Sequence, residues 1–126
     1  MSMLSGIDLF TAVVKLSGKD ITDYIIRALA RRDYSNVTVS YNYKKAGGGN
    51  WDTDSLNGTI QGTLAGKAET ETITVEQMVD TVIAELLADG HQFKVDSNSK
   101  GLSIGYSADD RTVTGKAHFL VPRKRV

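Results

Sequence analysis

The sequence predicts an α+β fold, with an antiparallel sheet of about four to five strands and the helices packed on one face. Three observations predict this class. Apolar residues recur at helical spacing in some segments, they alternate with polar residues in others, and turn-forming residues separate the segments. The chain has 126 residues, 40% of them hydrophobic, which suits one domain with a modest core. We expect residues 1–121 to form a single domain, in the order ααββαβββ, and residues 122–126 to form a basic C-terminal tail.

The first expected helix lies near the N-terminus. Ser5 is a suitable N-cap, and Leu4 and Leu9 can form a hydrophobic staple around it. Gly18 would then end the helix. A strand at Phe10–Leu16 is the alternative, because adjacent valines favour β-structure. We prefer the helix because its start and stop signals agree.

Two further helices are expected, each with a start signal, a stop signal and an apolar face. The second begins with Asp20 as N-cap and ends near Asp33. The third has Thr74 as N-cap and Gln77 as the reciprocal partner of a capping box, and Gly90 ends it. Its apolar face consists of Val75, Met78, Val79, Val82, Ile83, Leu86 and Leu87. Its acidic residues, Glu76, Asp80, Glu85 and Asp89, should lie mostly on a solvated face.

Alternation of apolar and polar residues predicts the strands. Residues 36–44 form the first, with valines and tyrosines on one face. Residues 57–66 form the second, in which recurring glycines would allow close packing or a bend. The last three strands are expected at His91–Asp96, Leu102–Ser107 and Thr112–Val121, and Pro122 should end the last of them.

The order helix, strand, polar loop, strand occurs twice, first from Asp20 and again from Thr74. In the two helices concerned, Asp23, Ile26 and Leu29 match Asp80, Ile83 and Leu86. This similarity is what an internal duplication would produce, but any two amphipathic helices would match as well. Both explanations stay open at this point.

Charge and composition exclude several classes of function. The formal net charge is zero, from 15 basic and 15 acidic residues, which argues against a nucleic-acid binder that relies on charge. The absence of cysteine excludes a thiolate metal site and a cysteine nucleophile, and it fits a reducing compartment. Residues 1–10 lack the regions of a signal peptide, and no apolar run approaches the ~20 residues that span a bilayer. We therefore expect a soluble, cytoplasmic protein that does not contact membranes.

The segment YNYKKAGGGNWDTDSLNG, between the first two strands, is the most unusual part of the chain. Its candidate ligand groups are Lys44, Lys45, Gly47, Gly48 and Gly49, whose ammonium and N–H groups suit a phosphate. Phosphate loops, however, lead directly into a helix N-terminus, and this segment connects two strands. We therefore interpret it as a flexible hairpin connection. Trp51 is the reason to keep a binding role open, since a tryptophan in a mobile loop needs a surface on which to pack.

Oxygen ligands at alternating positions in the same segment resemble the start of a calcium loop. They are Asn50, Asp52 and Asp54. The glycine and the glutamate that define such a loop are replaced by Ser55 and Gln61. We therefore predict no metal site.

The two histidines, His91 and His118, have no second metal ligand and no nucleophile motif at a suitable spacing. We predict no catalytic residue and no cofactor. Histidine is the residue that titrates near neutral pH, so an enzyme stays open as an alternative.

The basic tail contains Arg123, Lys124 and Arg125. If the first and last strands were neighbours, these residues could join Lys44, Lys45 and Trp51 on one surface. Basic and aromatic groups together suit single-stranded nucleic acid.

We expect a non-enzymatic binding module that acts through protein–protein interaction. Its partner would be another protein or a second copy of the chain, since small domains with exposed sheet edges associate readily into homodimers. Such a module would suit an accessory or inhibitor protein of a phage or mobile element. The alternative is a binder of phosphate or nucleotide ligands, or of single-stranded nucleic acid, that uses the Lys44–Gly49 loop and the basic tail.

Overall fold

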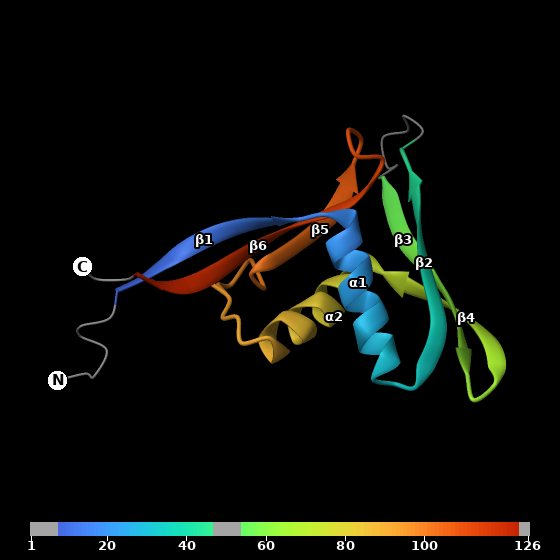
Figure 1. The fold of residues 1–126 in the computed structure, drawn as a ribbon. Helices are drawn as coiled ribbons and strands as arrows, with labels where there is room; N and C mark the ends of the chain where they lie inside the picture. Colours follow the sequence, from blue (N-terminus) through green and yellow to red (C-terminus); the bar gives the residue numbers. More distant parts are fainter. Residues whose placement is uncertain (1–7, 47–53, 124–126) are drawn as a thin grey trace.

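The computed structural model describes residues 8–46 and 54–123, which contain two helices and six strands (Figure 1). In chain order these are β1 (Asp8–Leu16), α1 (Gly18–Ala30), β2 (Tyr34–Lys44), β3 (Ser55–Leu64), β4 (Lys67–Thr74), α2 (Val75–Ala88), β5 (Leu102–Ser107) and β6 (Thr112–Arg123). The α+β class is confirmed. The predicted order ααββαβββ is wrong, because the described elements follow the order βαβββαββ.

The strands form two antiparallel three-stranded sheets, in the orders β1-β6-β5 and β2-β3-β4. The single sheet of about four to five strands is therefore a wrong prediction. The sheets lie close together at one end and diverge at the other, and both helices lie in the opening between them (Figure 1). Each helix contacts strands of both sheets, so the helices do not cover one face of one sheet.

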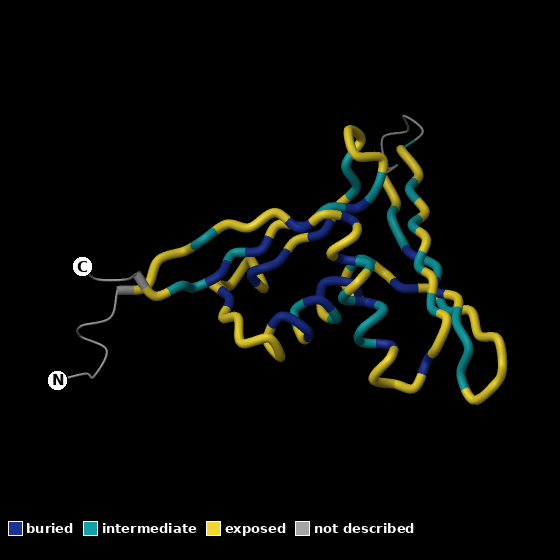
Figure 2. Tube along the Cα trace, viewed as in Figure 1, coloured by how far each residue is buried: buried dark blue, intermediate teal, exposed yellow. Residues whose placement is uncertain are grey.

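The core lies where the helices meet the two sheets (Figure 2). Its largest fully buried side chains are Ile21, Ile25, Met78, Val82, Leu86 and Val113. The predicted alternation in β2 is confirmed, because Val37, Val39 and Tyr41 pack against this core and the residues between them are exposed. Leu87 departs from the prediction, since 53% of it is exposed.

β1 corrects the expected N-terminal helix. The segment pairs with β6 along its whole length. Its adjacent β-branched residues, Val13 and Val14, favour an extended backbone. The alternative of a strand at Phe10–Leu16 is thus confirmed. The spacing of the apolar residues in this segment imitated a helix because apolar residues lie on both faces of the strand.

The start of α1 also differs from the prediction. Ser17 is the N-cap, and it forms a capping box in which Ser17 Oγ accepts from Asp20 N at 3.1 Å and Ser17 N donates to Asp20 Oδ2 at 3.0 Å. Asp20 is therefore the third residue of the helix and not its cap. Gly18 begins α1 instead of ending a helix, and a Cβ on it would lie 2.8 Å from Thr112 Cγ2. The capping box predicted at Thr74 for α2 is confirmed.

Two segments near the sheet edges depart from the prediction. β4 was not expected, because residues 67–72 are charged residues, threonines and one alanine, with no apolar face. The strand expected at His91–Asp96 is reduced to two isolated bridges, one between Phe93 and Phe119 and one between Asp96 and Ser99.

The last strand is longer than predicted. It continues through Pro122 to Arg123, so the proline does not end it. β5 flanks β6 only as far as Ala117, and Pro122 lies beyond that point, where proline is better tolerated. Residues 124–126 of the expected tail lie outside the described residues.

An internal repeat relates the two halves of the chain. The units β1–α1–β2–β3 and β4–α2–β5–β6 have the same order of elements. Each sheet takes one edge strand from one unit and its other two strands from the other unit. In the two helices, equivalent residues keep one constant spacing along the chain, which pairs the N-caps Ser17 and Thr74 and the buried residues Ile21 and Met78, Ile25 and Val82, and Leu29 and Leu86. The similarity seen in the sequence therefore corresponds to a repeat in the fold.

Two glycines at the same spacing show that the repeat extends to side-chain packing. Gly58 of β3 lies opposite Ile73 of β4, and a Cβ on it would lie 2.8 Å from Ile73 Cγ2 and 3.1 Å from Met78 Cε. Gly115 of β6 lies opposite Leu16 of β1, and a Cβ on it would lie 3.5 Å from Leu16 Cβ. Leu16 is equivalent to Ile73, so the two units exchange their first strands in the same way.

Candidate functional site

Of the predicted Lys44–Gly49 site, the structure describes only Lys44, Lys45 and Ala46. Lys44 is the last residue of β2, and both it and Lys45 are exposed. Gly47, Gly48, Gly49 and Trp51 lie outside the described residues, and so do Asn50 and Asp52 of the calcium-like pattern. Their roles stay predictions.

Asp54, which directly precedes β3, is hydrogen-bonded to the end of β2 and to the residue that precedes the glycines. Its Oδ2 accepts a hydrogen bond from the Tyr43 hydroxyl at 2.6 Å, and its Oδ1 accepts one from Ala46 N at 2.8 Å. The bond from Tyr43, supported by the one from Ala46, lowers the pKa of Asp54. The same bond raises the pKa of Tyr43. Both carboxylate oxygens of Asp54 therefore accept hydrogen bonds from within the hairpin.

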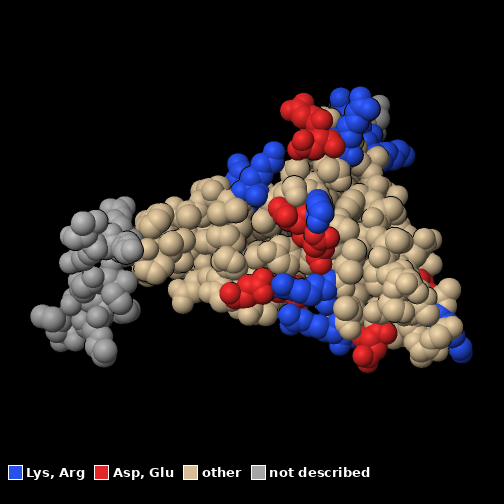
Figure 3. Space-filling view, viewed as in Figure 1, with Lys and Arg blue, Asp and Glu red and all other residues tan. Residues whose placement is uncertain are grey.

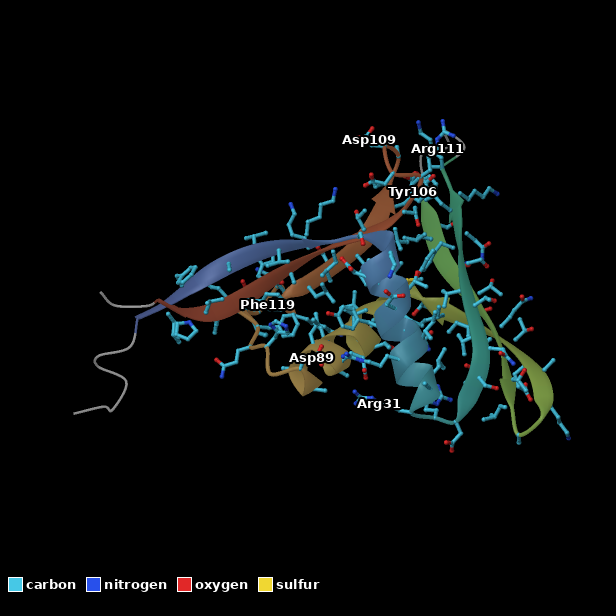
Figure 4. The ribbon with its side chains drawn as sticks, in the orientation of Figure 1. Arg31, Asp89, Tyr106, Asp109, Arg111 and Phe119 are labelled. Atoms are coloured by element: carbon cyan, nitrogen blue, oxygen red, sulfur yellow. The ribbon has the colours of Figure 1, made fainter. Side chains whose placement is uncertain are left out.

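Tyr43 also joins the two sheets. Its ring stacks on that of Tyr106, with the centroids 3.9 Å apart and an angle of 5° between the planes. The two tyrosines occupy equivalent places in the two units, because Tyr43 lies opposite Leu56 and Tyr106 lies opposite Val113. The stack therefore lies where the internal repeat brings the two sheets together, at their convergent end (Figure 4).

The strands that lead into the loop and the tail end far apart (Figure 1). Lys44 and Arg123 end strands of different sheets. Figure 1 shows the end of β6 at a tip of the molecule far from the end of β2. Lys124 and Arg125 lie outside the described residues. The backbone of Lys44 and that of Arg123 therefore lie far apart, and the common basic surface of the loop and the tail stays a prediction.

The acidic face expected on α2 is partly an ion-pair site. Glu85 is only 4% exposed, which corrects its placement on a solvated face. Arg27 Nε lies 2.6 Å from Glu85 Oε1, and Arg31 Nη2 lies 3.3 Å from the same oxygen. Arg27 Nη2 also reaches Asp89 Oδ2 at 3.0 Å, near the ends of α1 and α2 where Figure 4 labels Arg31 and Asp89. Acidic and basic groups are interspersed over the face shown in Figure 3, which argues against a large single-sign surface there.

The histidines do not form a relay in the described part of the chain. The His91 ring stacks on Phe119, with the centroids 4.5 Å apart. His118 lines a hollow of about 420 Å³ together with Asp96 and Ser99, but no hydrogen bond among the described residues joins its ring to either of them. No group of three acidic or histidine residues that could hold a metal ion occurs between residues 8 and 46 or 54 and 123.

Large apolar side chains are exposed together on β1. Leu9, Phe10, Val13 and Val14 have exposed fractions of 50%, 37%, 57% and 39%. Successive residues of a strand point to opposite faces, so both faces of β1 present apolar groups. β1 lies at the edge of its sheet, where it pairs with β6 and with no other described strand. β1 and β6 extend past the helices as an arm, and much of β1 is exposed along it (Figures 1 and 2).

The equivalent edge strand, β4, is polar. The spacing of the repeat pairs Phe10 with Lys67, Ala12 with Glu69, Val13 with Thr70, and Val14 with Glu71. Charged side chains on an edge strand discourage pairing with another chain. β4 is protected in this way, and β1 is not.

Sequence reasoning missed this edge because it assigned β1 to a helix. Two signals could have found it. Val13 and Val14 are adjacent β-branched residues, and no charged residue occurs from Leu9 to Val14.

Comparisons with known proteins yield no match, whether with family models, with curated proteins or with solved structures. Neither of the two described helices has the length and the apolar character needed to cross a lipid bilayer.

Proposed function

We propose that this chain is a non-enzymatic binding module that acts through protein–protein interaction, and that β1 is the strand its partner pairs with. The observation that carries the proposal is the contrast between two equivalent edge strands, β1 and β4. β4 has charged residues along its length, Lys67, Glu69 and Glu71, which discourage pairing with another chain, whereas β1 has no charged residue from Leu9 to Val14.

Strand addition fits the chemistry of β1. An added strand gains main-chain hydrogen bonds along a sheet edge and gains specificity from side chains on alternating faces. Val13 and Val14 point to opposite faces and are 57% and 39% exposed, so a bound strand would find an apolar neighbour on each face. Covering them removes apolar surface from water, which favours association.

The test compares a β1 variant with a matched β4 variant. Val13→Lys places a charge on the proposed edge, and Thr70→Lys places the same charge at the equivalent position of β4. Each immobilised protein is used to capture partners from extract, and each captured protein is then purified and titrated against all three. We expect the original chain and Thr70→Lys to bind alike and Val13→Lys to bind about tenfold more weakly or worse. Equal binding by Val13→Lys would rule out β1 as the site.

The same preparation separates the alternative function. The chain has a single tryptophan, Trp51, in the glycine-rich segment. Its fluorescence can be titrated at low salt with ATP and with single-stranded DNA. A salt-sensitive change would favour the phosphate or nucleic-acid interpretation over ours.

A further inference from the structure

We propose that the strand which pairs with β1 is the β1 strand of a second copy of the chain. The two copies would join in an antiparallel seam and form one continuous six-stranded sheet, β5-β6-β1-β1-β6-β5. This inference rests on the proposed function, and it names the partner.

β1 is self-complementary in such a seam. In a symmetric antiparallel pair of strands, one residue faces its own counterpart. Ala12 is the middle of the run Leu9–Lys15, and when it takes that place Phe10 of each copy faces Val14 of the other. Aromatic and β-branched residues that face each other across strands stabilise the pairing. Each such pair would occur twice.

Charge is compatible with self-pairing. Lys15 is the only charged residue from Leu9 to Leu16. In the antiparallel seam each Lys15 faces Leu9 of the other copy, so the two ammonium groups lie at opposite ends. In the equivalent seam of β4, Glu69 of each copy would face Glu69 of the other at the centre, and like charges facing each other weaken a strand pair.

The shape of the molecule leaves room for the seam. β1 and β6 form an arm that extends away from the helices (Figure 1). β1 runs from the tip of this arm to α1, so antiparallel pairing places the two bodies at opposite ends of the seam.

Sedimentation of the purified chain over a wide range of concentrations tests the proposal. We expect a dimer whose dissociation constant rises about tenfold or more in Val13→Lys and stays unchanged in Thr70→Lys. Circular dichroism of both variants should match the original chain, because Val13 is 57% exposed and Thr70 is exposed as well. Across the seam the two copies of residue 13 would lie diagonally, about 7–8 Å apart. Mixing Val13→Lys with Val13→Glu should therefore restore the dimer.

A disulfide tests the register. The chain has no cysteine, so Ala12→Cys introduces a single thiol. Residues that face each other in antiparallel strands have Cα atoms about 4.5–5.5 Å apart, which a disulfide can bridge. We expect oxidised Ala12→Cys to form a covalent dimer. Glu69→Cys, the equivalent change in β4, should stay monomeric under the same conditions.

The outcomes separate the two proposals. A chain that is monomeric at every concentration, yet captures another protein through Val13, overturns the seam and supports the proposed function. A dimer that survives Val13→Lys and does not cross-link through Ala12→Cys also overturns the seam. A monomer that captures nothing through β1 overturns both.

Discussion

The glycines at the strand-exchange points make the internal repeat testable through stability. In Gly58→Ala, the new Cβ would lie 2.8 Å from Ile73 Cγ2 and 3.1 Å from Met78 Cε. Overpacking of this kind costs about 1–3 kcal/mol. Replacing glycine by alanine also stabilises the folded state by about 0.4–1 kcal/mol, because alanine restricts the unfolded chain. We therefore expect the free energy of unfolding to fall by about 1–2 kcal/mol.

Two other glycines provide graded controls. Gly105 in β5 has no atom within 4 Å of an added Cβ, so Gly105→Ala should be stabilised by about 0.4–1 kcal/mol. Gly115 is intermediate, because the nearest atom to its Cβ would be Ser103 O at 3.2 Å. The expected order of stability is Gly105→Ala, then Gly115→Ala, then Gly58→Ala.

Urea unfolding followed by circular dichroism measures these changes, and thermal unfolding should shift by roughly 4 °C per kcal/mol for a chain of this size. A double variant identifies the cause. Ile73→Ala removes the Cγ2 that crowds position 58, so combining it with Gly58→Ala should cost less than the two single changes added together, by about 1 kcal/mol. Additive losses, or a Gly58→Ala protein as stable as Gly105→Ala, would refute the close packing of β3 against β4.

Three further predictions concern the Arg27–Glu85 ion pair, the hydrogen bonds of Asp54 and the α2 capping box. Arg27→Met should lower the free energy of unfolding in urea by about 1–3 kcal/mol, because it leaves Glu85 buried with only one weaker arginine partner. Glu85→Met should cost less, since Arg27 is 38% exposed and can turn to solvent, and equal losses would contradict this account. The hydrogen bond from Tyr43 lowers the pKa of Asp54 below its ordinary value of 3.8. The stabilisation from this bond is complete above pH 3.8 and is lost as the pH falls through the lowered pKa. In Asp54→Asn the melting temperature should therefore fall less steeply as the pH is lowered through this acidic range. Thr74→Ala should cost about 1 kcal/mol in urea, and an unchanged midpoint would show that the α2 capping box contributes nothing.

Local signals predicted the helices where a cap and an apolar run adjoin. Thr74 shows this for α2. At α1 the cap is Ser17, and β1 runs into the helix with one residue between them, so no turn residues mark the change from strand to helix. Gly18 was misread as the end of a helix because its role is close contact with Thr112, which lies far along the chain.

The edge strands β1 and β4 were missed for different reasons. β1 is held by β6, which lies far along the chain, and that contact leaves no local pattern. β4 pairs with β3 across a two-residue turn, Ala65-Gly66, with both residues at positive φ, but its own residues 67–72 show no apolar face. Tyr43 shows the same limit at the candidate loop. Its place on the inward face of β2 was predictable, but its stacking on Tyr106 depends on how the two sheets meet.

The repeat separates what the fold requires from what it does not. The two units share their order of elements, their capping boxes and the spacing of their buried residues, so these features serve folding in both. β4 occupies its edge position with polar residues, which shows that an edge strand in this place does not need the apolar side chains of β1. The units also differ in the hairpin connection, residues 45–54 in one and 108–111 in the other, and in the connection from helix to strand, residues 31–33 and 89–101. Both candidate functions therefore fall where the two units differ, and Val13→Thr, which installs the β4 residue in β1, should preserve folding and weaken only the association.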